Sequence, residues 1–292
     1  MNKISARETR AAYASILTGA ALWGIIGVWN RGLMAEGLTP TAIVTVRNFG
    51  GMLLLSLVFA FRDRSVFHVR REHLPYFFGT GVVSVVLFTV CYFSCQRICS
   101  LAVASILLYT APSFVVLLSA LIWKEPVTKK KLSALALTLL GCALVCGVFQ
   151  GDGQTVTVTG ILLGLGAGFF YALYSIFGRC ALAHYDSMTV TVWTFLFAGP
   201  ASLLFLRPGQ MAAALSPRML ALALGLVLFS TVLPYIFYTR GLAKVEAGKA
   251  SIMASLEPVV ASLAGVVLFQ EPMSVFTLCG IVCVLAGVWI LR

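Results

Sequence analysis

The sequence predicts an all-α polytopic membrane protein with ten transmembrane helices, arranged as two inverted five-helix repeats around a central cavity. The 292 residues are 60% hydrophobic and only 11% charged, with a mean hydropathy of +0.98, whereas about a quarter of the residues in a soluble domain are charged. Apolar runs of about 20 residues, each long enough to cross a hydrocarbon core of about 30 Å, recur along the whole chain. One short sequence pattern also occurs once in each half.

Ten apolar runs, separated by short polar segments, are the expected membrane spans. The residues before the first run are polar and lack a signal-peptide pattern, so this run is expected to be the first span. Basic loops follow the second and fourth spans, and the loop 150–157, which has no Lys or Arg, divides the two halves. The expected spans cover residues 12–34, 40–61, 75–95, 101–123, 131–149, 158–179, 187–206, 218–239, 247–269 and 272–291.

The repeated pattern consists of a serine, a proline inside an apolar run, and a glutamate thirteen residues after that proline. Each half contains five spans, an odd number, so the second half starts on the opposite side of the membrane from the first. We expect residues 1–149 to form the first repeat and residues 150–292 the second, inverted one. Such inverted repeats are associated with alternating-access transporters. The first copy runs Ser105, Pro112, Glu125 and the second Ser251, Pro258, Glu271, every pair 146 positions apart.

The basic residues are distributed unequally between the two sides of the membrane. Of the 21 Lys and Arg residues, sixteen fall on the side of the N-terminus, four fall on the opposite side, and Arg47 lies within a span. Because Lys and Arg concentrate in cytoplasmic loops, both termini are expected in the cytoplasm. This topology accounts for the net charge of +11, and no nucleic-acid partner is expected.

Neither a metal site, a cofactor nor an enzyme active site is expected. Several of the eight cysteines share helical faces inside apolar runs, where small packing residues are the favoured interpretation. All three histidines and all three aspartates fall in loops. A metal centre or an intramembrane catalytic site needs such groups clustered within the spans.

The paired prolines are expected to interrupt the fourth and ninth spans. Proline inside a helix lacks a backbone donor and clashes with the carbonyl four residues earlier. For Pro112 and Pro258 these carbonyls belong to Leu108 and Ala254. Interrupted spans in matching positions of two halves point to a transporter's binding site and its gating elements. A kink that serves only packing is the alternative.

Two charged residues lie deep within the expected spans, away from their ends. Glu257, directly before Pro258, could bind a substrate ammonium group or carry a proton, since intramembrane acids usually face a cavity or a partner. Its alternative role is a protonated side chain bonded to backbone at the kink, and its repeat counterpart is the neutral Ala111. Arg47 could hold a substrate carboxylate or pair with Glu257, and snorkelling towards the interface is its alternative.

Aromatic residues within the spans are candidates for an amphipathic cavity wall. Some of them could instead belong to the interfacial belts of the membrane. Tyr92 and Tyr238 are matched across the repeat, which favours them. The glutamates Glu125 and Glu271 lie at the membrane boundary, where turn formation or capping accounts for them. The aromatic candidates are Trp23, Tyr92, Tyr109, Tyr171, Tyr174, Tyr235 and Tyr238.

Two five-span halves, each with a mid-span proline followed by a glutamate at the helix end, resemble the EamA-type transporters of the drug/metabolite transporter superfamily. The stretch from Ser255 through Glu257-Pro258 to Glu271-Pro272 carries the strongest resemblance, and Arg47 matches a position where that family often has arginine. The resemblance implies a central cavity lined by spans one, three, four, six, eight and nine, with spans five and ten peripheral.

The resemblance also implies a function. It predicts transport of small metabolites, often amino acids and commonly outward, across the cytoplasmic membrane. The expected partners are a small-molecule substrate and the lipid bilayer, and a homodimer is left open. A proton antiporter of cationic compounds that uses Glu257 is the alternative, followed by a channel or a receptor.

Overall fold

The computed structural model describes residues 5–147, 157–206 and 216–291. The expected loop 150–157, apart from Thr157, and the basic residues Lys3, Arg207 and Arg292 lie outside the described residues. The helices are α1 (Ala6–Gly24), α2 (Ile26–Ala35), α3 (Pro40–Arg62), η1 (Arg64–Phe67), η2 (Arg71–His73), α4 (Leu74–Phe78), η3 (Gly79–Val86), α5 (Leu87–Gln96), α6 (Leu101–Leu108), α7 (Ala111–Trp123), α8 (Lys129–Val145), α9 (Val158–Leu182), α10 (Ser187–Ser202), η5 (Leu203–Phe205), α11 (Pro217–Val227), η6 (Leu228–Val232), α12 (Leu233–Leu242), α13 (Ala247–Ala254), α14 (Glu257–Phe269) and α15 (Val275–Ile290).

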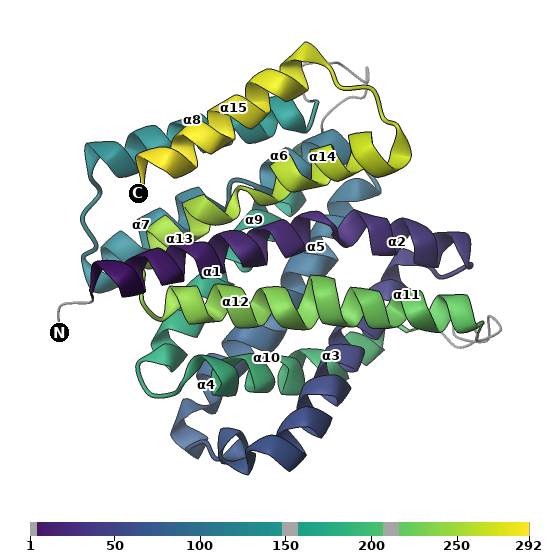
Figure 1. Cartoon of the computed structure of the whole chain (residues 1–292), viewed down its shortest axis with the longest axis vertical. Coiled ribbons are helices and arrows are strands. Elements are labelled where there is room, and N and C mark those ends of the chain that lie inside the picture. The colour runs from purple at the N-terminus through teal and green to yellow at the C-terminus, as the bar shows by residue number, and fades with distance from the viewer. Residues whose placement is uncertain (1–4, 148–156, 207–215, 292) are drawn as a thin grey trace.

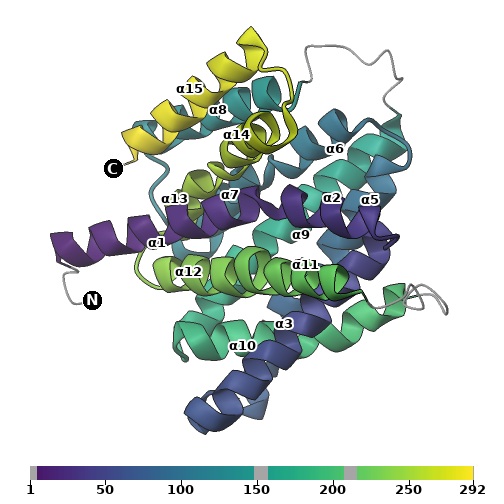
Figure 2. The same ribbon diagram turned by 45° about the vertical axis from the view of Figure 1, so that its right-hand side comes forward.

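The described part of the chain is a bundle of helices without strands (Figures 1 and 2). Eight of its helical stretches are long and apolar enough to cross a membrane, so the chain is a polytopic helical membrane protein. They correspond to eight of the ten expected spans. The other two expected spans form α8 and α15, with 17 and 16 residues, or about 25 Å at 1.5 Å per residue.

The two halves of the sequence interdigitate, because helices from before residue 148 pack against helices from after residue 156. α1 packs on α12, α5 on α9, α3 on α10, α7 on α13 and α8 on α15. Figure 1 shows two of these pairs clearly, purple α1 beside green α12 and teal α8 beside yellow α15. A space at the centre of the bundle is therefore walled by both halves.

The expected interruptions of the fourth and ninth spans are present, but the prolines start helices rather than kink them. α6 ends at Leu108 and α7 begins at Ala111, so Pro112 lies in the first turn of α7. Pro258 occupies the same place in α14. In a first turn the missing N–H of proline has no helical partner to lose. Each break is thus a short non-helical turn between two separate helices.

Two further irregular segments occur inside long spans. η3 and η6 are π-helical and lie in the third and eighth expected spans. In η6 the Thr231 hydroxyl donates to the carbonyl of Leu226, five residues earlier, at 3.0 Å. π-Helical turns in α-helices are frequent at functional sites, and η3 supplies part of the wall of the central cavity.

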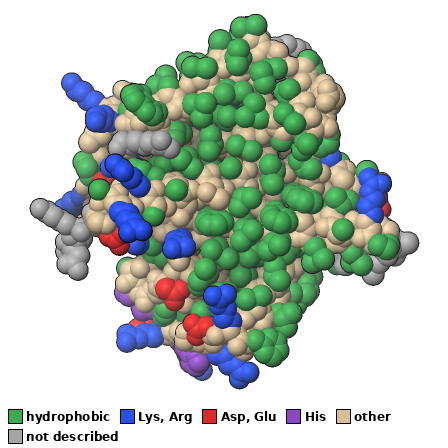
Figure 3. All heavy atoms as spheres, in the orientation of Figure 1, with side chains coloured by type: hydrophobic (Ala, Val, Ile, Leu, Met, Phe, Trp, Pro, Cys, Tyr) green, Lys and Arg blue, Asp and Glu red, His purple; other side chains and the backbone are tan. Residues whose placement is uncertain are grey.

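The surface agrees with a membrane environment. Figure 3 shows hydrophobic side chains over the middle of the bundle, with Lys and Arg gathered at its edges. Large apolar side chains such as Leu204, Val275 and Trp289 are more than two-thirds exposed. In water such exposure would be costly, whereas in lipid it is the expected outer face of a span.

The α8–α15 interface gives a prediction about stability. A Cβ on Gly141 would lie 2.7 Å from the Gly280 carbonyl oxygen and 2.6 Å from a Val284 methyl carbon. Gly141→Ala should therefore lower the free energy of unfolding by about 1–3 kcal/mol, measured by thermal unfolding in detergent. Gly27→Ala is the control, since no heavy atom lies within 4 Å of its Cβ position. Equal unfolding temperatures for the two variants would contradict this close packing.

Candidate functional site

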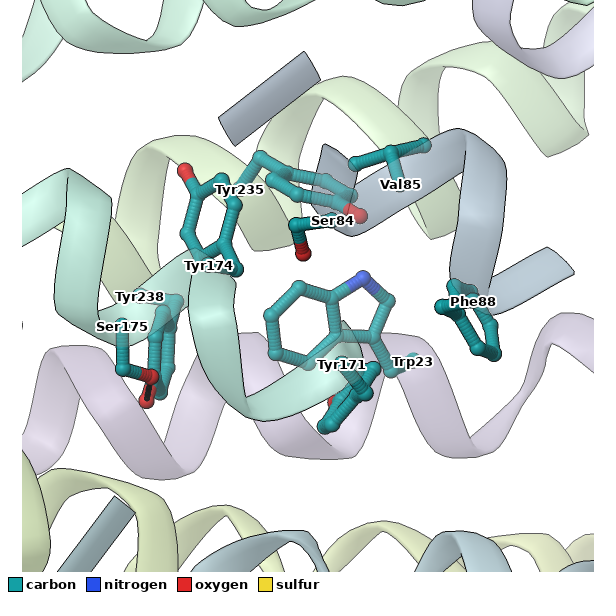
Figure 4. A pocket seen from close by; sticks show the side chains of 9 residues that line it. All are labelled: Trp23, Ser84, Val85, Phe88, Tyr171, Tyr174, Ser175, Tyr235 and Tyr238. Carbon is teal, nitrogen blue, oxygen red and sulfur yellow. Dashed lines mark hydrogen bonds between the residues drawn. The ribbon is translucent and has the colours of Figure 1, made fainter. Parts of the chain in front are cut away.

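A small cavity lies at the centre of the bundle, and aromatic side chains enclose it (Figure 4). Its volume of about 10 Å³ is room for roughly one water molecule. We call five of its lining residues the aromatic cage: Trp23, Tyr171, Tyr174, Tyr235 and Tyr238. The remaining lining residues are Ser84, Val85, Phe88 and Ser175.

Trp23 occupies the middle of the aromatic cage. Its ring centroid lies 5.2 Å from that of Tyr235 at an interplanar angle of 85°, and 5.3 Å from that of Tyr238. In Figure 4, Tyr235 and Tyr174 lie above the indole and Tyr171 lies below it. Edge-to-face pairs at these separations contribute about 0.5–1.5 kcal/mol each beyond their burial, so the cage has a defined shape.

Two tyrosine hydroxyls of the aromatic cage are bound to polar side chains. The Tyr174 hydroxyl lies 2.6 Å from the Thr239 hydroxyl, and the Tyr238 hydroxyl lies 2.7 Å from that of Ser175. All four residues are buried. These short bonds join α9 to α12 and hold the cage in place, so these hydroxyls belong to the scaffold.

The other two tyrosines contact charged groups instead. Arg47, on α3, donates to the Tyr235 hydroxyl at 3.4 Å. The Tyr171 hydroxyl donates to the Glu257 carboxylate at 3.4 Å, and Glu257 is the first residue of α14. No ion pair joins Arg47 to Glu257 among the described residues. One cationic side chain, Arg47, and one anionic side chain, Glu257, are thus each hydrogen-bonded to a different tyrosine of the cage.

Hydrogen bonding around Arg47 is incomplete in the described residues. Its Nε atom is buried and has no hydrogen-bond partner, and the same holds for both polar side-chain atoms of the adjacent Asn48. Buried polar atoms are almost always paired, with protein or with ordered water. These unpaired polar atoms, two donors and one acceptor, therefore mark a place where water or the polar group of a ligand can bind.

Several candidates predicted from the sequence lie away from the cage. The hydroxyl of Tyr92 lies 3.2 Å from that of Ser105, and its ring packs with a cluster around Cys95 and Cys99. Pro258 follows Glu257 directly and fixes the start of α14, whereas Pro112 follows the neutral Ala111 in α7. In the described part of the chain no group of three or more metal-ligating side chains occurs.

Ser84, Val85, Phe88 and Ser175 line the cavity but were not candidates in the sequence. One signal was available for Ser84, because Ser230 lies 146 positions after it and both belong to π-helical segments. Val85 and Phe88 are ordinary apolar residues of a span. Only the packing of η3 and α5 against α9 brings them to the cavity.

Comparison with known proteins supplies the family. The model of the EamA-like transporter family matches residues 10–147 and again residues 158–292. The chain belongs to the EamA-like transporter family. This EamA-like transporter is 32% identical to an uncharacterized transporter of Archaeoglobus fulgidus over 286 residues, which cover 97% of each chain.

Two further relatives have more specific names. This transporter is 26% identical to the threonine/homoserine exporter RhtA of Salmonella typhimurium over 94% of this chain and 88% of that one. It is 27% identical to a probable amino-acid metabolite efflux pump of the same species over 64% and 66% of the two chains. One crystal structure, at 17% identity, superposes with a TM-score of 0.79 over 96% of both chains, so the fold is shared.

The two kinds of tyrosine in the cage can be separated by stability. Tyr174→Phe removes a 2.6 Å bond and leaves the buried Thr239 hydroxyl without that partner, so it should cost about 1–3 kcal/mol. Tyr171→Phe removes only a 3.4 Å contact and should cost much less. Thermal unfolding of both variants measures the difference. A larger loss for Tyr171→Phe would contradict the assignment of Tyr174 to the scaffold.

Proposed function

We propose that this chain is a secondary transporter that exports amino acids or related small polar metabolites across the cytoplasmic membrane by alternating access. One observation carries the proposal. Arg47 and Glu257, of opposite charge, are each hydrogen-bonded to a tyrosine of the same aromatic cage. They form no ion pair with each other among the described residues, so both remain available to a substrate.

The chemistry of these groups fits a zwitterion. An arginine guanidinium suits a carboxylate because its planar donors can bind both oxygens. The Glu257 carboxylate suits an ammonium group, which also binds the face of an indole such as that of Trp23. The apolar parts of the cage residues would then surround the small side chain of the amino-acid substrate. The present cavity of about 10 Å³ corresponds to a closed state that must widen to admit such a substrate.

The relatives support the substrate class and the direction. They include a threonine/homoserine exporter and a probable amino-acid metabolite efflux pump. Both names describe outward movement of amino acids or their metabolites. We take the same class and direction for this chain.

Packing supports two inverted repeats, residues 1–149 and 150–292. In such a repeat the first span corresponds to the sixth and the third span to the eighth. The contact of α1 in span one with α12 in span eight therefore corresponds to the contact of α9 in span six with α5 in span three, and both contacts are present. The pairs α3–α10 and α8–α15 are converted into themselves. The helix breaks after Leu108 and Ala254 also differ by 146 positions.

The same symmetry supports ten spans. α8 and α15 are equivalent helices that pack together, so both cross the membrane or neither does. Their close contact at Gly141 and Gly280 resembles the small-residue interfaces of membrane helices. With ten spans, sixteen basic residues lie on the side of both termini and four on the other, which supports cytoplasmic termini.

A proton antiporter of cationic compounds is the second candidate, and Glu257 as an acid within a span favours it. Arg47 argues against a cation transporter, because its guanidinium, which contacts Tyr235, would repel a bound cation. A channel is separated from both transporters by flux that does not saturate with substrate concentration.

Charge-neutralising variants test the zwitterion site. Purified protein is reconstituted in vesicles loaded with a mixture of amino acids, and the efflux of each is measured with and without a pH gradient. Glu257→Gln and Arg47→Gln should each slow efflux of the transported amino acid at least about tenfold, because each loses a hydrogen bond to a charged group.

Glu72→Gln is the matched control, since this carboxylate is 64% exposed and lies in the loop helix η2. Thermal unfolding of each variant separates loss of transport from loss of folding. Efflux by Glu257→Gln at the rate of Glu72→Gln, with both variants folded, would contradict the proposal.

A further inference from the structure

Among the described residues five ion pairs connect the halves of the chain. Two of them occupy matching positions of the repeat, and neither belongs to the aromatic cage. Arg31 of α2 pairs with Glu271, which follows α14. Arg179 of α9 pairs with Glu125, which follows α7. We propose that these pairs are the outer and inner latches of alternating access: one must open to expose the cage to each side of the membrane. This inference rests on the transport mechanism proposed above.

The two latches are equivalent positions of the repeat. Glu125 and Glu271 are 146 positions apart, and Arg31 and Arg179 are 148 apart, the offset that also separates Trp23 from Tyr171 in the first spans of the halves. In each latch the carboxylate belongs to one half and the guanidinium to the other. Equivalent contacts at opposite ends of inverted repeats are what two alternating gates require.

The surroundings of the arginines repeat as well. Arg31 stacks over the ring of Phe269 at 4.2 Å, and Arg179 over the ring of Trp123 at 5.0 Å. Phe269 and Trp123 are 146 positions apart. The residue before each glutamate, Lys124 or Gln270, has a left-handed backbone with φ of 55° or 57°. These turns aim both carboxylates in the same way.

The latches lie at opposite ends of the bundle. By the topology proposed above, the ends of α2 and α14 are on the outer side and the ends of α7 and α9 on the cytoplasmic side (Figure 1). Both latches are engaged in this structure, and the cage between them encloses about 10 Å³.

The latches differ in strength because their burial differs. The outer pair is 54% and 44% exposed, whereas the Glu125 side chain of the inner pair is 5% exposed. Glu125 also accepts from the backbone N–H groups of Ala247 and Gly248 at 3.2 and 3.5 Å. Exposed pairs contribute little to stability, so the outer latch should open more readily.

A buried lysine strengthens the inner latch further. Lys131 is 1% exposed, and its Nζ atom lies 3.5 Å from Glu125 and 3.1 Å from Glu246. The repeat counterpart of Lys131 is Thr277, so the outer latch has no such cation. Removing one partner from a buried charge cluster is strongly destabilising, since the remaining charge is uncompensated. The closed inner side thus depends on Glu125.

Hydrogen–deuterium exchange of the reconstituted protein, without substrate, tests the latches. Glu125→Gln should open the inner end and raise exchange of the backbone amides at 178–182 about tenfold or more. Glu271→Gln should open the outer end and raise exchange at 26–35 by about two- to fivefold. Because one end closes when the other opens, each variant should also slow exchange at the opposite end.

A charge exchange provides the matched control. Glu271→Arg alone should open the outer end, and Arg31→Glu combined with Glu271→Arg should restore exchange at 26–35 towards the wild-type rate. Faster exchange at both ends in either glutamine variant, with a lowered unfolding temperature, would show a structural role and overturn the proposal. So would a double variant that exchanges as fast as Glu271→Arg.

The measurement separates this inference from the transport proposal. Exchange requires no knowledge of the substrate, so the latches can be confirmed even if no amino acid is transported. Conversely, the protein could transport amino acids while hydrogen–deuterium exchange is unchanged in both Glu125→Gln and Glu271→Gln. That result would support the transport function and reject the latches.

Discussion

The structure depends on one constraint, that a backbone polar group in hydrocarbon must find its partner within the protein. An α-helix meets this constraint because its backbone hydrogen bonds are made within the segment itself, and the described spans are helical. Irregular backbone is tolerated only where protein or a polar cavity surrounds it. The two π-helical segments and the two breaks ahead of α7 and α14 are such places, and η3 and α14 both carry residues at or beside the cage. The backbone that departs from the α-helix is thus concentrated near the site.

The interdigitated packing explains how one site can be opened from two sides. The cage takes Trp23 from the first half and four tyrosines from the second, while Arg47 and Glu257 come from different halves. Movement of one half against the other changes the distance between these groups. The inner and outer latches also join the halves. In the proposed mechanism the movement that opens one end therefore also alters the site.

The sequence predicted the helices well because each expected span is a long apolar run, and that signal is local. It also predicted the position of both helix breaks, since proline acts on its own backbone. Its account of how Pro112 and Pro258 fit the helix was wrong: they start helices, because the turn before each already ends the preceding one. The aromatic candidates divided in space, with Tyr92 away from the cage, since repeat matching cannot tell which helical face meets the centre.

Contacts between distant residues were beyond prediction from one sequence. Glu125 and Glu271 looked like turn or capping residues, because their arginine partners are 54 and 240 positions away. The contacts of Arg47 with Tyr235 and of Tyr171 with Glu257 were beyond prediction for a related reason: they form only when α9 and α12 are packed. The repeat nevertheless contained the latch pattern, since the arginines and the glutamates recur at the offsets already established from Trp23 and Pro112.

We propose above that Arg47 and Glu257, beside the aromatic cage, bind the two charges of a zwitterion, and ligand discrimination tests this proposal most directly. The unfolding temperature of the purified protein is measured with a series of amino acids, and for the one that stabilises it, with the matching amine and the matching carboxylic acid. A ligand that binds only the folded state raises this temperature, and at a fixed ligand concentration the rise is larger for a tighter ligand. We expect the amino acid to stabilise the protein and neither analogue to do so at the same concentration. Equal stabilisation by the amine alone would contradict this expectation and would favour a transporter of cations.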